Sequence, residues 1–62
     1  MDKTTVIKFK DLETSDEALA IVQYDKTSVV VGLSLKSNGD MQVVMGKETA
    51  KELCDALKEA LG

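Results

Sequence analysis

The sequence predicts a two-layer α+β domain, in which a four-stranded antiparallel β-sheet, built as a meander, has one C-terminal α-helix packed on one face. Three observations predict it. Apolar residues recur at helical spacing in the last third of the chain, they alternate along the segments before it, and a Ser-Asn-Gly-Asp turn signal at 37–40 separates two of these segments. Short connections make neighbouring strands antiparallel. At 62 residues, we expect the range 1–62 to form one domain.

The C-terminal helix is expected over 48–61. Ala, Leu, Lys and Glu fill most of its positions, and all four are good helix formers. Gly46 is an acceptable N-cap, and Gly62 stands where a glycine commonly ends a helix. The apolar residues form one stripe, which needs an apolar surface to cover it. This stripe consists of Ala50, Leu53, Cys54, Leu57, Ala60 and Leu61.

The strands are predicted from apolar alternation and from their β-branched residues. In the second segment Ala and Leu also suit a helix, but Ile21, Val22 and Tyr24 favour a strand, as does the short length. An acidic loop, 11–17, joins the first two strands, with Leu12 as its expected apolar anchor. The four strands are expected at 4–10, 17–25, 29–36 and 41–45.

The hairpin between the last two strands has a register that apolar pairing can decide. A three-residue loop at 37–39 would pair Leu35 with Met41 and put the apolar residues of both strands on one face. A two-residue loop would place polar residues beside apolar ones. The three-residue loop also needs a left-handed residue at its last position, where Gly39 stands.

Packing the helix stripe on one sheet face defines the expected core. The sheet is expected to contribute Ile7, Phe9, Leu19, Ile21, Val31, Leu33, Leu35, Val43 and Met45. The helix is expected to cover them with Leu53, Cys54, Leu57 and Leu61.

The opposite sheet face carries more apolar residues than a water-facing surface needs. If a three-residue loop at 25–27 joins the second and third strands, Val22 lies beside Val30 and Ala20 beside Gly32. A contiguous apolar patch of this kind is typical of an interface. A register slip of one residue would move every side chain of the second strand to the other face. The predicted interface consists of Ala20, Val22, Tyr24, Val30, Gly32 and Val44.

The composition argues against several classes of function. Eleven acidic residues against eight lysines give a net charge of −3, and the chain has no His, no Arg and one Cys. It therefore cannot form a structural zinc site or an internal disulfide, and it lacks the imidazole base. A weakly acidic chain with one Phe and one Tyr is a poor candidate for nucleic-acid binding.

Cys54 is the strongest nucleophile in the chain, and it falls in the middle of the helix on the apolar stripe. A reactive thiol needs a base, a cation or a helix N-terminus beside it, so we interpret Cys54 as a buried structural residue. No catalytic, cofactor-binding or metal-binding residue is predicted. We expect the protein not to be an enzyme.

The remaining function class is a small, acidic, soluble interaction protein. We expect a homodimer that acts as an accessory, regulatory or inhibitor protein by binding another macromolecule, because a chain of this size buries little core by itself. Two alternatives stay open: an oligomer that binds a small ligand between its subunits, and an acidic nucleic-acid mimic that blocks a DNA-binding protein. The single thiol, the absence of a signal-peptide pattern and the short apolar runs predict a cytoplasmic location, without membrane binding.

Overall fold

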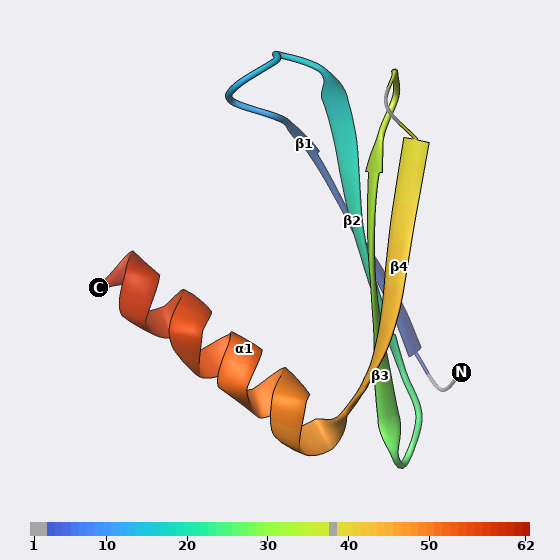
Figure 1. The fold of residues 1–62 in the computed structure, drawn as a ribbon, viewed down its shortest axis with the longest axis vertical. Helices are drawn as coiled ribbons and strands as arrows, with labels where there is room; N and C mark the ends of the chain where they lie inside the picture. The colour runs from blue at the N-terminus through green and yellow to red at the C-terminus, as the bar shows by residue number, and fades with distance from the viewer. Residues whose placement is uncertain (1–2, 38) are drawn as a thin grey trace.

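The chain folds as four antiparallel strands followed by one helix, which confirms the predicted fold class (Figure 1). The computed structural model describes residues 3–37 and 39–62. The strands form one sheet in the order β1-β2-β3-β4, so each strand pairs with its neighbour in sequence. The elements are β1 (Lys3–Lys10), β2 (Glu17–Tyr24), β3 (Ser28–Leu35), β4 (Gly39–Gly46) and α1 (Lys47–Leu61).

Helix α1 begins and ends at the two predicted glycines. Gly46 is the N-cap, in an extended conformation with φ −75° and ψ 170°. Gly62 is the C-cap, where its positive φ of 95° lets its N–H donate to the Glu59 carbonyl at 3.2 Å. Glu48 in the first turn and Lys58 in the last turn match the helix dipole.

The apolar stripe of α1 does not pack on the sheet of its own chain, so the expected burial of this stripe is wrong. The backbone of α1 approaches β3 and β4 near its start and then diverges from the sheet (Figure 1). The exposed fraction rises along the stripe from 42% at Leu53 to 57% at Leu57 and 87% at Leu61. Cys54 is exposed as well.

The cause lies at the junction between β4 and α1. Strand β4 ends at Gly46 and α1 starts at the next residue, Lys47. Connections between helices and strands usually contain about 2–6 residues, which turn the chain back over the sheet. Here the extended backbone of Gly46 makes that connection alone, and the helix continues away from the strands.

The interior of the chain is correspondingly small. Among the described residues, the buried apolar side chains are Ala18 and Val30, and neither belongs to the expected core. The Cα radius of gyration is 12.7 Å, where a compact chain of this length would have about 10.6 Å. Sheet and helix therefore meet at one end and leave most of their apolar surfaces uncovered.

The register between β2 and β3 differs by one residue from the prediction. Val22 pairs with Val31 rather than Val30, because the turn contains four residues, 25–28. The Asp25 carboxylate closes this turn: its Oδ1 accepts hydrogen bonds from the N–H groups of Thr27 at 3.0 Å and Ser28 at 2.9 Å. This shift moves every side chain of β2 to the other face.

The register between β3 and β4 differs from the prediction by two residues, which leaves the faces unchanged. Met41 pairs with Leu33 rather than Leu35, and Leu35 pairs with Gly39. The Ser34 hydroxyl donates to Asp40 Oδ1 at 2.8 Å across this pairing. Gly39 has the expected positive φ, 87°. The predicted loop position Asn38 lies outside the described residues.

The loop between β1 and β2 is held by polar contacts. Asp11 is its centre: the Thr14 hydroxyl donates to Asp11 Oδ2 at 2.7 Å, and the Ser15 N–H donates to the Asp11 carbonyl at 2.8 Å. Leu12, the expected anchor, is instead almost fully exposed. Ser15 has a positive φ of 63°, which is unusual for a residue with a side chain.

Candidate interaction surface

One face of the sheet is almost entirely apolar. Residues paired across antiparallel strands share a face, so the three registers assign every described strand residue to one side. We call this side the apolar face. It consists of the apolar residues Ile7, Phe9, Ala18, Ala20, Val22, Tyr24, Val29, Val31, Leu33, Leu35, Met41, Val43 and Met45, together with Lys3, Thr5 and Gly39.

Much of the apolar face is open to solvent. Phe9, Leu33 and Met41 are exposed at the end of the sheet far from the helix junction, and Val43 is exposed nearer to it. Single exposed apolar residues are common on protein surfaces, but a contiguous set across four strands is not. Sequence reasoning assigned about half of these residues to a closed core through their alternation, and placed Ala20, Val22 and Tyr24 on the opposite face.

The opposite side, the mixed face, carries polar and apolar residues together. Glycine and lysine occur here beside valine and leucine, as on a water-facing sheet surface. Val30, which is buried, lies between Gln23 and Val44 in the ladder. The mixed face consists of Thr4, Val6, Lys8, Lys10, Glu17, Leu19, Ile21, Gln23, Ser28, Val30, Gly32, Ser34, Asp40, Gln42, Val44 and Gly46.

The structure divides the predicted interface between these two faces. Ala20, Val22 and Tyr24 lie on the apolar face, whereas Val30, Gly32 and Val44 lie on the mixed face. The assumption that all six share a face is therefore wrong, and the four-residue turn at 25–28 is the reason. The β2 residues join the side that was expected to be the core, which enlarges the apolar face.

The first turn of α1 lies on the side of the apolar face. Lys47 Nζ is 5.1 Å from the centroid of the Tyr24 ring, a distance typical of a cation–π contact. Because Tyr24 belongs to the apolar face, the helix leaves the sheet on that side. Beyond this first turn the stripe of α1 and the apolar face diverge.

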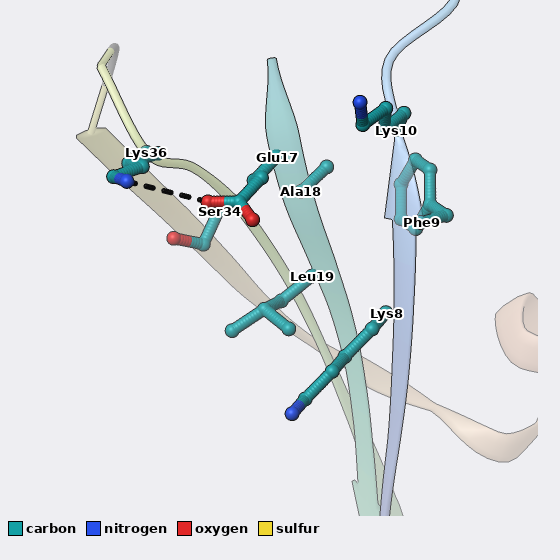
Figure 2. Close-up of a pocket in the computed structure, with 8 residues that line it drawn as sticks. All are labelled: Lys8, Phe9, Lys10, Glu17, Ala18, Leu19, Ser34 and Lys36. Atoms are coloured by element: carbon teal, nitrogen blue, oxygen red, sulfur yellow. Dashed lines mark ion pairs between the residues drawn. The ribbon is translucent and has the colours of Figure 1, made fainter. Parts of the chain in front are cut away.

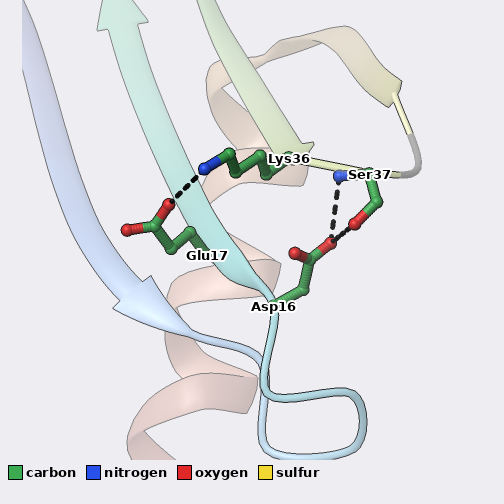
Figure 3. A network of polar contacts seen from close by, with 4 residues as sticks. All are labelled: Asp16, Glu17, Lys36 and Ser37. Atoms are coloured by element: carbon green, nitrogen blue, oxygen red, sulfur yellow. Dashed lines mark hydrogen bonds and ion pairs between the residues drawn. The ribbon is translucent and has the colours of Figure 1, made fainter.

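A polar cluster holds the two loops at the far end of the sheet together (Figure 3). Asp16 Oδ2 accepts hydrogen bonds from the Ser37 hydroxyl at 2.7 Å and the Ser37 N–H at 3.0 Å. Lys36 Nζ forms an ion pair with Glu17 at 3.3 Å. The bonds from the Ser37 hydroxyl, and then its N–H, lower the pKa of Asp16 below its usual value. These side chains hold the two turns together.

Two shallow depressions flank this end of the sheet. One, of about 580 Å³, is lined by residues of both faces: Lys8 and Leu19 point to one side of the strands and Phe9 to the other (Figure 2). The second, of about 480 Å³, includes Leu33 and Met41 of the apolar face. Both are open, and both are lined by residues of the two faces, so neither is an enclosed chamber.

The described residues provide little catalytic or metal-binding chemistry. Within residues 3–37 and 39–62, no group of three His, Cys, Asp or Glu side chains is placed to hold a metal ion. Cys54 is exposed on the stripe of α1, well inside the helix and away from its N-terminus.

Comparisons with protein-family models, with curated protein sequences and with solved structures found no match for this chain. In the part of the chain that the structure describes, no helix is both long enough and apolar enough to cross a membrane.

Proposed function

We propose that the protein is a small non-catalytic interaction protein that works as a homodimer and binds another macromolecule, as accessory, regulatory and inhibitor proteins do. The observation that carries this proposal is the uncovered apolar face, together with the uncovered stripe of α1. Leu33 on the sheet and Leu57 on the helix are each more than half exposed. A chain that keeps such surfaces in water gains little from folding alone.

The exposed area supports a dimer of substantial size. The chain exposes 5124 Å², whereas a compact monomer of 6.7 kDa would expose about 3,900 Å². The excess of about 1,200 Å² per copy would give an interface of about 2,400 Å² for two copies, within the range of obligate homodimers. The dimer interface of this proposal is the apolar face, with Val22 and Val43 near its centre.

The mixed face and the acidic side of α1 remain for the macromolecular partner. In a dimer built on the apolar face, Lys8, Lys10 and Val44 stay in water, as do Glu48 and Glu59 on the side of α1 opposite its stripe. These surfaces combine charged residues with small apolar groups, such as the cross-strand pair Val30 and Val44, which is typical of the rim and core of transient interfaces.

Light scattering of the purified protein tests whether it is a homodimer, and native mass spectrometry tests whether a small molecule is bound to it. The proposal predicts twice the chain mass at micromolar concentration and no retained small molecule. It also predicts that affinity capture from the native host recovers a stoichiometric macromolecule. A monomeric mass at high concentration would overturn the proposal.

The alternative, a small-ligand-binding oligomer, has one observation in its favour. The depression that includes Leu33 and Met41 is lined in part by the apolar face, so a second copy on that face would cover part of it. Native mass spectrometry distinguishes the two functions, because a ligand held between subunits would add a constant mass to the dimer and be lost with dissociation.

A further inference from the structure

The stripe of α1 and the apolar face are complementary in size. A helix of 15 residues is about 22 Å long, and a strand of 8 residues spans about 26 Å. Four strands spaced about 4.8 Å apart leave a surface about 15 Å wide, which one helix about 10 Å in diameter largely covers. One helix per sheet is therefore enough to close the core that each chain leaves open.

The two surfaces are also complementary in chemistry. Packing the stripe against an apolar face would bury Leu53, Leu57 and Leu61. It would leave Glu52 and Asp55 on the opposite side of α1, in water. The Lys51–Asp55 pair, at 3.1 Å, is exposed and would stay accessible. No charged group of α1 has to lose its hydration for the stripe to be covered.

The helix cannot readily cover the face of its own chain, because Gly46 alone connects it to β4. A junction without loop residues favours exchange of an element between copies over closure within one copy. The rising exposure from Leu53 to Leu61 follows from this junction, since each turn of α1 lies farther from its own sheet.

We propose that two copies exchange their helices, so that α1 of each copy lies on the apolar face of the other. This inference rests on the proposed homodimer and specifies how it is built. A second copy is the occupant because it buries both uncovered surfaces at once: each copy has one stripe and one face, and a two-fold axis pairs them reciprocally. A foreign helix would cover the face but leave the stripe of α1 in water. The excess area of about 1,200 Å² per copy is also what such an exchange would need.

The sole cysteine makes this arrangement testable by disulfide cross-linking. Cys54 lies on the stripe, so in the exchanged dimer it faces the sheet of the second copy. The wild-type chain carries the helix thiol, and Cys54→Ala combined with Val43→Cys or Leu33→Cys carries a sheet thiol. The two proteins are mixed, unfolded, refolded together under reducing conditions and then oxidised with diamide.

Helix exchange predicts a disulfide between the two different chains, identified by intact mass and lost on reduction. Two sheet positions are used because a disulfide requires Cα atoms about 4.4–6.8 Å apart. The matched control is Cys54→Ala combined with Val44→Cys. It moves the sheet thiol from position 43 to the next residue, which lies on the mixed face. This control is expected to give little mixed cross-link.

Four results would overturn the exchange. A Cys54–Cys54 disulfide in the wild type, without mixed cross-links, would mean that the helices pair with each other. An internal disulfide within a monomeric chain carrying both Cys54 and Val43→Cys would mean that α1 closes on its own sheet. A dimer by light scattering that gives no mixed cross-link at either sheet position would contradict the exchange but leave the proposed homodimer intact. A monomer would overturn both the exchange and the proposed homodimer.

Discussion

Asp25 and the Ser28 backbone are joined in both directions: the side-chain Oδ1 of Asp25 accepts the Ser28 N–H at 2.9 Å, and the backbone N–H of Asp25 donates to the Ser28 carbonyl at 3.1 Å. The Ser28 hydroxyl also donates to the same carboxylate oxygen at 3.1 Å. This turn sets the register between β2 and β3. It thereby decides that Val22 and Tyr24 lie on the apolar face rather than opposite it.

Acidification should weaken the fold by protonating the carboxylates of Asp25 and Asp16. The N–H groups of Thr27 and Ser28 lower the pKa of Asp25, and the Ser37 hydroxyl and N–H lower that of Asp16, in both cases from 3.8. A lowered folded-state pKa stabilises the fold above the unfolded value, and this stabilisation is lost as pH falls through the folded value. The melting temperature should therefore drop most steeply below about pH 3.8.

Asp25→Asn tests that linkage. It removes the charge while keeping an acceptor oxygen, so it should lower the melting temperature at neutral pH and reduce the further loss on acidification. Melting followed by circular dichroism at a series of pH values measures both effects. Glu13→Gln, in the loop between β1 and β2, is the control for loss of one carboxylate. The account of this turn fails if Asp25→Asn and Glu13→Gln have the same pH dependence.

Gly39 should tolerate substitution in a particular order. Its φ is 87° and the space beside it is open, so conformation rather than a clash limits the residue. Gly39→Asn should cost least and Gly39→Val most, about 1–2 kcal/mol in the free energy of unfolding. Denaturant titration measures the order. Gly46→Asn is the control, because φ there is −75° and asparagine is a good N-cap; equal effects at both sites would contradict the prediction.

Ser15 should be replaceable with a gain in stability. Its φ of 63° is strained for a residue with a side chain and unstrained for glycine. Ser15→Gly should raise the free energy of unfolding by about 0.5–1 kcal/mol, the relief of strain less the added entropy of the unfolded chain. Glu13→Gly is the control in the same loop and should not stabilise. A loss of stability in Ser15→Gly would contradict this prediction. It would show that the serine side chain stabilises the loop by more than the relief of backbone strain.

Cys54 should report on assembly through its reactivity. It is exposed in the single chain but would face the second copy in the exchanged dimer. Labelling by a thiol reagent should be slow at concentrations where the dimer forms and should accelerate on dilution towards the monomer. A labelling rate that is independent of concentration and equal to that in denaturant would speak against coverage of the stripe.

The sequence was sufficient for the number, type and order of the elements but not for how they assemble. Helical spacing located α1, and Gly46, Gly62 and the positive φ of Gly39 followed from local backbone chemistry. The register of β2 could not be read from apolar alternation, because this strand has apolar residues in both phases, such as Ile21 and Val22. Hydrogen bonds from one turn carboxylate decide it, and no periodicity encodes them.

The placement of the helix was beyond sequence reasoning for a different reason. An amphipathic stripe shows that an apolar surface must cover it, but not which copy of the chain supplies that surface. The junction at Gly46 supplies the missing information, and it appears only once the ends of β4 and α1 are known to within one residue. The six residues of the predicted interface share a face only in the predicted register between β2 and β3, so this prediction also depended on structural detail that the sequence does not show.

Light scattering of two neighbouring substitutions tests whether the apolar face is the dimer interface. Val43 and Val44 are adjacent in β4, but Val43 lies on the apolar face and Val44 on the mixed face, 47% and 63% exposed in the single chain. Val43→Lys and Val44→Lys change the net charge equally. Leu57→Lys on the stripe, with Glu59→Gln opposite it, repeats the comparison on α1 in case the sheet variant does not fold.

If the apolar face is the dimer interface, Val43→Lys and Leu57→Lys should dissociate the dimer and lower the melting temperature. The reason is that an unpaired lysine buried in a desolvated interface lowers stability by about 3–5 kcal/mol. Val44→Lys and Glu59→Gln should leave the mass unchanged and shift stability by no more than about 0.5 kcal/mol. Dissociation by Val44→Lys with an intact Val43→Lys dimer would place the interface on the mixed face and contradict the account.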